Sequence, residues 1–224
     1  MTQNKIDSVI EAIEDLGFIP LFYHSEINIC LEVIRSIFNG GCNLIEFTNR
    51  GDKAKDNFGK IMEEFRYKNS DNIIGVGTVY NLSDAREFIS MGADFLVGPC
   101  FVAAIAELCN EENILYMPGC ATPTEIMHAN SYDVELIKIF PANTLGGPDF
   151  IKSVKAPFPW LKLIPSGGVK FEEESLKNWF KSGVSAVGMG SDLIGKQILD
   201  NKNFNLLERM THELIEMIKK ARCY

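Results

Sequence analysis

A lysine within an apolar stretch has the clearest potential for chemistry in this sequence. Residues 134–142, VELIKIFPA, are typical of a short buried strand in which Lys138 shares one face with Leu136 and Phe140. Pro141 ends the strand because it has no backbone donor. Burial lowers the pKa of an amine, so Lys138 could act as a nucleophile near neutral pH. On this stretch alone, the simpler interpretation is favoured: a lysine that reaches solvent or pairs with a carboxylate.

The lysine strand belongs to a regular alternation of strands and helices. Strands are predicted at residues 18–23, 43–48, 72–76, 94–97, 114–117, 134–142, 161–165 and 185–188. Helices are predicted at residues 3–16, 28–39, 52–67, 83–91, 102–110, 122–129, 148–154, 171–182 and from 191 to near the C-terminus. The run TPTE at 122–125 supplies the cap, the proline and the glutamate of a helix start.

This alternation predicts an α/β fold with a parallel sheet. The strand–helix units favour a closed (β/α)8 TIM barrel with an extra N-terminal helix, and residues 1–224 are expected to form a single barrel domain. No G-x-G-x-x-G motif follows the first strand, which argues against an open dinucleotide-binding sheet.

The composition is that of a globular protein with an acidic balance. Hydrophobic residues make up 46% and charged residues 23%, and the formal net charge is −8. Because no dense Lys/Arg tract occurs, nucleic acid and anionic membranes are not expected as main partners. No apolar run is long enough to span a bilayer, and the N-terminus lacks the apolar segment of a secretion signal. A small anionic substrate remains compatible with a locally positive site.

The six cysteines and three histidines have no metal-site spacing. The cysteines include no CxxC pair, and the histidines include no HxH or HxxxH pair. His128 and His212 are expected to be solvated or packed. The thiols are typical of reduced, mostly buried cysteines, so we expect a cytoplasmic protein without a metal.

In a barrel, chemistry takes place at the C-terminal ends of the strands. Glu46, inside the apolar run LIEF, is either a buried partner of a cation or a general acid/base with a raised pKa. Arg50 either forms an ion pair at the surface or binds a carboxylate with two parallel hydrogen bonds from its guanidinium. Thr78 either caps a turn or binds a carboxylate. A barrel would let Glu46 and Lys138 face each other across its interior.

The ends of the seventh and eighth strands predict an anion site. Gly167 and Gly168 precede one helix, and Gly190 and Ser191 are expected to open another. Loops after strands seven and eight form the usual phosphate site of such barrels, and glycines let backbone amides approach an anion. Two tight turns are the simpler alternative. We favour the anion site because both halves occur at the appropriate strands.

Several short motifs then occur in order between about residues 18 and 194. They are IEFTNR (45–50), VGTV (76–79), VGPCF (97–101), MPGCATPTE (117–125), IKIFPA (137–142), PSGGV (165–169) and GMGS (188–191). Together they resemble the 2-dehydro-3-deoxy-6-phosphogluconate (KDPG) / 4-hydroxy-2-oxoglutarate (KHG) aldolase family. The resemblance implies a class I, metal-free (β/α)8 aldolase, usually a homotrimer, that forms a covalent Schiff base on a lysine and needs no cofactor.

The resemblance also implies a role for each candidate residue. Lys138 resembles the Schiff-base lysine and Glu46 the acid/base. Residues that resemble the substrate-binding set are Arg50 and Thr78 for the pyruvyl carboxylate, Pro99 and Phe140 for the pocket wall, and Ser166, Gly167, Gly168, Gly190 and Ser191 for the phosphate end. The sequence departs from the family pattern at Tyr23, where many members carry an arginine that helps to hold phosphate. It also departs at Gly98, in place of a serine, and in PSGGV, in place of PTGGI.

The implied reaction is the cleavage of a 2-keto-3-deoxy sugar acid, a small anionic keto acid. KDPG would give pyruvate and glyceraldehyde 3-phosphate, as in the Entner–Doudoroff route, and KHG would give pyruvate and glyoxylate. Two alternatives stay open: a sugar-phosphate epimerase or isomerase, and a non-catalytic barrel that binds a phosphometabolite. An epimerase would need a different base and would form no imine. A lysine, a glutamate and an arginine at three strand ends argue against a binding protein.

Overall fold

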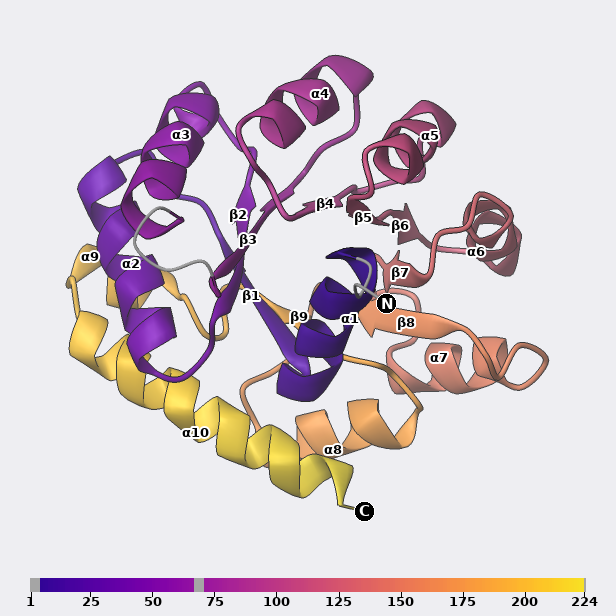
Figure 1. The fold of residues 1–224 in the computed structure, drawn as a ribbon. Coiled ribbons are helices and arrows are strands. Elements are labelled where there is room, and N and C mark those ends of the chain that lie inside the picture. The colour runs from indigo at the N-terminus through magenta and orange to yellow at the C-terminus, as the bar shows by residue number, and fades with distance from the viewer. Residues whose placement is uncertain (1–4, 67–70, 224) are drawn as a thin grey trace.

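The computed structural model describes residues 5–66 and 71–223, and strands and helices alternate along this part of the chain (Figure 1). The strands are β1 (Phe18–Phe22), β2 (Leu44–Thr48), β3 (Ile73–Gly77), β4 (Phe95–Val97), β5 (Leu115–Met117), β6 (Gly119–Cys120), β7 (Leu136–Ile139), β8 (Lys162–Pro165) and β9 (Val187–Met189). The helices are α1 (Lys5–Leu16), α2 (Ile27–Asn39), α3 (Ala54–Phe65), α4 (Leu82–Ser90), α5 (Ala103–Glu111), α6 (Pro123–Asn130), α7 (Pro148–Lys155), α8 (Glu173–Lys181), α9 (Lys196–Asp200) and α10 (Phe204–Arg222). The predicted helix ends at residues 3 and 67 lie outside the described residues.

The strands pair in parallel and form two curled sheets. One sheet has the order β5-β4-β3-β2-β1-β9, and the other has the order β6-β7-β8. A bridge between Ser166 and Gly188 links the end of β8 to β9, and Pro118 separates β5 from β6. The protein is therefore an α/β fold in which parallel strands curl around a common interior, as in TIM barrels, with helices outside (Figure 1).

The core lies between the strands and the surrounding helices. Its largest fully buried side chains include Phe18, Phe47, Phe58, Phe88 and Phe95. All five residues of β2 are buried, as expected for parallel strands that are covered on both faces. Such a core holds the strand ends in a fixed arrangement, which a site built from several strand ends needs.

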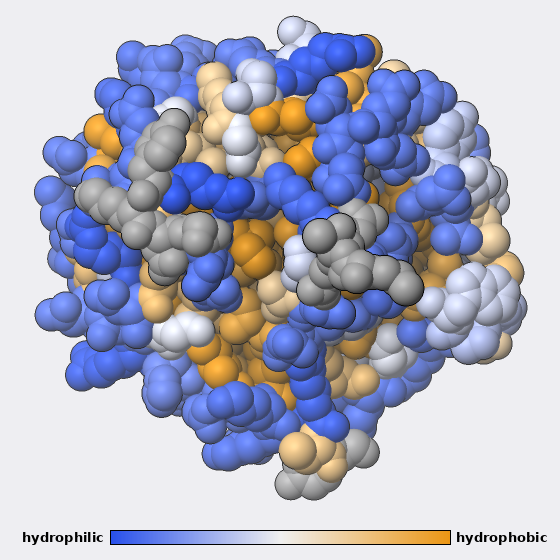
Figure 2. All heavy atoms as spheres, in the orientation of Figure 1, coloured by the Kyte–Doolittle hydropathy of each residue, from blue (hydrophilic) through white to orange (hydrophobic). Residues whose placement is uncertain are grey.

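Helix α1 packs across the amino ends of the strands (Figure 1). Its apolar residues Val9, Ile10 and Ile13 are buried, and its Glu14 pairs with Lys162 at the start of β8, with 3.0 Å between the charged atoms. Hydrophilic residues form most of this face, and apolar residues show between α1 and the outer helices (Figure 2). Since α1 covers the amino ends, the carboxyl ends of the strands are left for a site.

The predicted start of α6 is confirmed. The Thr122 hydroxyl accepts a hydrogen bond from the Glu125 amide at 3.2 Å. The Glu125 carboxylate accepts from the amides of Ala121 and Thr122 at 2.7 and 2.9 Å, and Pro123 occupies the first helical position. This capping box satisfies amides that the helix itself leaves without partners.

The prediction of one continuous helix from residue 191 was wrong. Residues 191–194 form a turn in which the amides of Leu193 and Ile194 donate to the carbonyl of Gly190. Helix α9 then ends before Lys202, which has a φ of 49°, and α10 begins after Asn203, whose side chain accepts from the Leu206 amide at 3.3 Å. The left-handed residue and the new cap separate the two helices.

Among the described residues, we find no helix that combines the length and the apolar character needed to cross a membrane.

Candidate active site

Lys138 and Glu46 line the same small space inside the curled sheets. The space also has walls from Ile19, Leu21, Val97, Met117, Ile164, Ser166 and Gly188. Glu46 is only 3% exposed, whereas Lys138 is partly buried and its Nζ lies 5.1 Å from the centre of the Phe140 ring. The fold therefore places Glu46 and Lys138 beside the same interior space, as the sequence predicted. Lys138 and Phe140 lie on the same side of the strand.

Burial shifts the pKa values of these two groups in opposite directions. Desolvation is the main cause that lowers the pKa of Lys138, and the nearby positive charge of Arg50 acts in the same direction. The Glu46 charge opposes this shift. Desolvation also raises the pKa of Glu46, while Lys138 and Arg50 oppose that shift. The environment therefore favours a neutral amine beside a carboxyl group that can hold or release a proton.

Two glycines in β3 make room for these groups inside the sheets. A Cβ on Gly77 would overlap the Glu46 carboxylate, and a Cβ on Gly75 would overlap the ring of Phe95. Gly75 is also the residue of β3 in register with Glu46. A side chain at position 77 would displace the carboxylate and one at position 75 would displace Phe95, so Gly77 leaves the space that Glu46 occupies.

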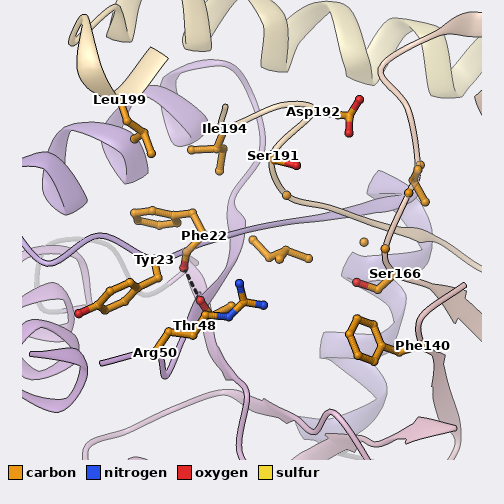
Figure 3. A pocket seen from close by; sticks show the side chains of 16 residues that line it. Phe22, Tyr23, Thr48, Arg50, Phe140, Ser166, Ser191, Asp192, Ile194 and Leu199 are labelled. Atoms are coloured by element: carbon orange, nitrogen blue, oxygen red, sulfur yellow. Dashed lines mark hydrogen bonds between the residues drawn. The ribbon is translucent and has the colours of Figure 1, made fainter. Parts of the chain in front are cut away.

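A larger cavity of about 300 Å³ opens at the carboxyl ends of the strands (Figure 3). Its lining includes most of the predicted binding residues, namely Arg50, Phe140, Ser166, Gly167, Gly168, Gly190 and Ser191. Leu21, Ser166 and Gly188 line both this cavity and the smaller space with Lys138, so the two adjoin. A small polar substrate in the larger cavity would therefore have access to the amine.

The guanidinium of Arg50 is directed into this cavity from the loop after β2 (Figure 3). The loop is held by hydrogen bonds from the Asn49 amide to the Gly77 carbonyl, at 2.7 Å, and from the Thr48 hydroxyl to the Phe22 carbonyl, at 3.1 Å. These contacts tie the ends of β1, β2 and β3 together. An anchored arginine suits a planar carboxylate, which it can bind with two parallel hydrogen bonds.

The predicted anion site is formed by turns. Gly167 and Gly168 have φ values of 93° and 87°, a left-handed backbone that glycine adopts without strain. A Cβ on Gly168 would also overlap the side chain of Asn143. The prediction that Gly190 and Ser191 open a helix was wrong, because they lead into the turn before α9. Residues of both loops still line one cavity, and their binding of an anion stays a prediction.

Thr78 and Pro99 are not among the residues that line either cavity. Thr78 directly follows β3 and has a φ of 63°, a strained conformation for a β-branched residue. Pro99 follows β4, and its carbonyl packs against Gly119, the residue in register with Lys138. Both residues therefore lie at the strand ends around the site, and their predicted contacts with substrate stay predictions.

Sequence reasoning missed part of the cavity wall. Phe22, Val169, Asp192, Ile194 and Leu199 also line it. Of these, Val169 and Asp192 had a signal in the sequence, since they directly follow Gly168 and Ser191 of the predicted anion site. Tyr23 lines the cavity too, and the centre of its ring lies 5.8 Å from the centre of the Phe47 ring.

The described residues hold no cluster of three histidine, cysteine or acidic side chains that could bind a metal ion. All six cysteines are free thiols. Burial raises the pKa of four of them, Cys30, Cys42, Cys109 and Cys120, to about 12. Such thiols stay protonated and are poor nucleophiles at neutral pH. Lys138, whose pKa is lowered, is thus a better candidate nucleophile than these four thiols.

A comparison with models of protein families shows to which family the chain belongs. The model of the KDPG and KHG aldolase family matches residues 9–210. The chain belongs to the KDPG and KHG aldolase family. This aldolase is therefore a carbon–carbon lyase.

Individual relatives agree with this assignment. The aldolase is 27% identical over 212 residues to the 2-dehydro-3-deoxy-phosphogluconate aldolase of Haemophilus influenzae, covering 94% of this chain and 97% of the relative. It is 25% identical to the KHG/KDPG aldolase of Escherichia coli K12, covering 90% and 92% of the two chains. It shares its fold with the KDPG aldolase of Legionella pneumophila, with a TM-score of 0.84, 24% identity and coverage of 95% and 98%. That crystal structure contains pyruvate captured as a covalent carbinolamine.

Proposed function

We propose that this aldolase is a class I enzyme that cleaves a 2-keto-4-hydroxy acid through a Schiff base on Lys138. KDPG, which would give pyruvate and glyceraldehyde 3-phosphate, and KHG, which would give pyruvate and glyoxylate, are the candidate substrates. The observation that carries the proposal is the pairing of Lys138, whose pKa is lowered, with the buried carboxyl of Glu46 in one small space. The covalent carbinolamine in the similar Legionella aldolase supports the same chemistry.

In the first stage, the neutral amine of Lys138 attacks the C2 ketone of the substrate. The resulting carbinolamine loses water, for which Glu46, acting through a water molecule, supplies and removes protons. The product is a protonated imine, which withdraws electrons from the C3–C4 bond.

In the second stage, Glu46 or its relayed water takes the proton of the C4 hydroxyl. The C3–C4 bond then breaks, its electron pair forms an enamine, and the aldehyde leaves. Protonation at C3 and hydrolysis of the imine release pyruvate and restore the free amine. Positioned proton transfer of this kind contributes about 10²–10⁴-fold to the rate.

The other predicted residues would bind the substrate. Arg50 and Thr78 would hold the pyruvyl carboxylate, and Phe140 and Pro99 would form the wall. The phosphate or other distal group would meet Ser166, Gly167, Gly168, Gly190 and Ser191. The position of most of these residues around the larger cavity supports this arrangement.

We also propose that the two curled sheets form one closed (β/α)8 barrel, with α1 as an addition to it, and that residues 1–224 are a single domain. The bridge between Ser166 and Gly188 supports closure. A metal-free, cytoplasmic homotrimer completes the proposal. The free thiols support the location, and light scattering of the purified protein would test the trimer.

The test is reduction with borohydride in the presence of pyruvate, read by intact mass and peptide mapping, with and without EDTA. We expect one reduced pyruvyl adduct on Lys138 that EDTA does not affect. Lys138→Ala should lose both the adduct and the turnover of KDPG and KHG. Glu46→Gln should still form the adduct but turn over about 10²-fold more slowly.

Lys155→Ala is the matched control. Burial lowers the pKa of Lys155 as well, yet its Nζ donates to the Leu161 carbonyl at 2.8 Å, away from Glu46. This variant should form the adduct and turn over as the wild type does. Near-native activity of Lys138→Ala, or folded wild type without an adduct at high pyruvate, would contradict the proposal and favour an epimerase or a binding protein.

A further inference from the structure

The end of the cavity away from Arg50 contains an ion pair that the proposed reaction does not use. Asp192 lies beside Ser191 on that side of the cavity (Figure 3). Its carboxylate pairs with Lys170, which follows the Gly167–Gly168 turn, with 3.2 Å between the charged atoms. The pair thus joins the two loops of the predicted anion site across the cavity rim.

The two partners do not face the cavity equally. Asp192 is among the lining residues, and its side chain is 26% exposed. Lys170 is not among them, and its side chain is 57% exposed. Asp192 is therefore the partner that lies nearer to a bound substrate, while Lys170 is not part of the cavity wall.

The remaining polar groups at this end are neutral. They are the hydroxyls of Ser166 and Ser191 and the amides of the two loops. Among the described residues that line the cavity, Arg50 is the one with a positive charge, and the proposed function commits it to the pyruvyl carboxylate. A phosphate dianion would thus gain neutral donors only, and it would be repelled by Asp192.

A hydroxyl group fits the same surroundings better. An ionised carboxylate accepts hydrogen bonds but cannot donate one to a phosphate oxygen. A substrate hydroxyl can donate to Asp192 and accept from a serine hydroxyl or a loop amide. A phosphate dianion offers this carboxylate no donor beyond Lys170, whereas a hydroxyl adds one, so the cavity discriminates by charge and by hydrogen bonding together.

We infer that Asp192, paired with Lys170, is a specificity-determining residue that directs this aldolase toward 2-keto-3-deoxy sugar acids with a distal hydroxyl instead of a phosphate. The inference rests on the proposed function, because it needs the same cleavage chemistry, and it assigns a substrate with a hydroxyl where KDPG has its phosphate and KHG its second carboxylate. Asp192 disfavours phosphate in two ways, through its own charge and by pairing with Lys170.

The test compares kcat/KM for 2-keto-3-deoxy-6-phosphogluconate with kcat/KM for 2-keto-3-deoxygluconate. In the wild type, the ratio of the two should be below one. Asp192→Asn frees Lys170 and should raise the ratio about fivefold to tenfold at low salt, with a smaller gain in 1 M salt. Lys170→Met leaves Asp192 unbalanced and should lower the ratio.

Glu14→Gln is the matched control. It removes a carboxylate of similar exposure from a lysine pair with 3.0 Å between the charged atoms, but at the opposite, amino end of the strands. It should leave the substrate ratio unchanged. An unchanged ratio in folded Asp192→Asn, or shifts of the same sign in Asp192→Asn and Lys170→Met, would overturn the inference.

Binding of inorganic phosphate, measured by calorimetry, separates this inference from the proposed function. Asp192→Asn should bind phosphate about fivefold to tenfold more tightly than the wild type, and Lys170→Met more weakly. Equal affinities in all three proteins would also overturn the inference. Failure of pyruvate trapping on Lys138 would instead overturn the proposed function, whatever the phosphate affinities are.

Discussion

The charges on three side chains control the reactivity of the candidate nucleophile. Burial and Arg50 both lower the pKa of Lys138, whereas Glu46 raises it. Imine formation needs the neutral amine, so its rate should rise with pH through the pKa of Lys138. Arg50 therefore has a second role beside the proposed carboxylate binding. By lowering the pKa of Lys138, it keeps a larger fraction of the amine neutral at a given pH.

Replacement of Arg50 tests this electrostatic role. Arg50→Met removes the positive charge, so the pKa of Lys138 should rise and the pH dependence of imine formation should move to higher pH. Arg50→Lys keeps the charge but loses the planar fork, so its pH dependence should stay near that of the wild type. Both variants should bind pyruvate about tenfold more weakly.

The measurement is the rate of borohydride trapping against pH, taken at several pyruvate concentrations so that binding and ionisation are separated. A profile of Arg50→Met that coincides with the wild type would show that Arg50 acts on the carboxylate alone. A shift in both variants would mean that the fork geometry, and not the charge, determines the pKa of Lys138.

At the scale of elements, β3 shows how a strand can be shaped around a catalytic group. Its apolar residues build the core, but Gly75 and Gly77 leave space on the inner face for Phe95 and Glu46. Directly after the strand, Thr78 takes a φ of 63°. Small residues and a strained backbone at a strand end are costs that the surrounding fold must offset.

Gly77→Ala should lower kcat about 10²-fold, because its new methyl group overlaps the Glu46 carboxylate and displaces the acid/base. Steady-state kinetics together with circular dichroism of the folded state would measure this effect. Lys138 is unchanged in this variant, so the reduced pyruvyl adduct should still form, as in Glu46→Gln.

Gly59→Ala is the matched control for this substitution. Gly59 lies within α3, and a Cβ there would meet no atom within 4 Å. This variant should keep full activity and gain about 0.5–1 kcal/mol in the free energy of unfolding, since alanine favours a helix. Equal kinetic effects of the two substitutions would contradict a specific role for the space at Gly77.

At the scale of the whole molecule, α10 connects distant parts of the chain. It packs against α2 and α8 (Figure 1). Its residues Leu207, Thr211 and Leu214 are fully buried. At its end, Arg222 donates hydrogen bonds to the carbonyls of Asp15 and Ser185 at 3.0 and 3.1 Å. Through these hydrogen bonds, the end of α10 holds the connection between α1 and β1 in place.

Arg222→Ala should lower the free energy of unfolding by about 1–3 kcal/mol, because two carbonyls lose a charged donor and the contact with the Phe180 ring is removed. Urea denaturation would measure the loss. Pyruvate trapping on Lys138 should stay unchanged, since the site lies at the other end of the strands.

Arg209→Ala, on the exposed side of the same helix, serves as the control and should change the free energy of unfolding by less than about 0.5 kcal/mol. A similar loss in both variants would mean that α10 is sensitive to charge in general and that Arg222 has no special anchoring role.

Much of the site could be predicted from local patterns. The period of two in VELIKIFPA put Lys138 and Phe140 on one face, and they do contact each other. The capping signals at 122–125 and the glycines at 167–168 were also sufficient for their turns. Each of these features depends on a few neighbouring residues and on backbone chemistry that the residue types themselves carry.

Other features depend on contacts between segments far apart in sequence. The break between α9 and α10, the φ of Thr78 and the pairing of Asp192 with Lys170 had no clear local signal. Pro118, which separates β5 from β6, was placed after a strand but not recognised as a division between two sheets. These features result from packing between segments that are distant in sequence, so no short stretch of the sequence predicts them.

The sequence by itself determined the alternation of strands and helices through its periodicity. Its ordered motifs, through their resemblance to a known family, indicated the family and the candidate nucleophile and acid/base. Only the tertiary structure decided how the groups act on one another. The lowered pKa of Lys138 requires burial and a neighbouring arginine, and the polarity of the distal end depends on which partner of the Asp192–Lys170 pair faces the cavity. Desolvation and charge interactions depend on distance in space, and folding alone sets those distances.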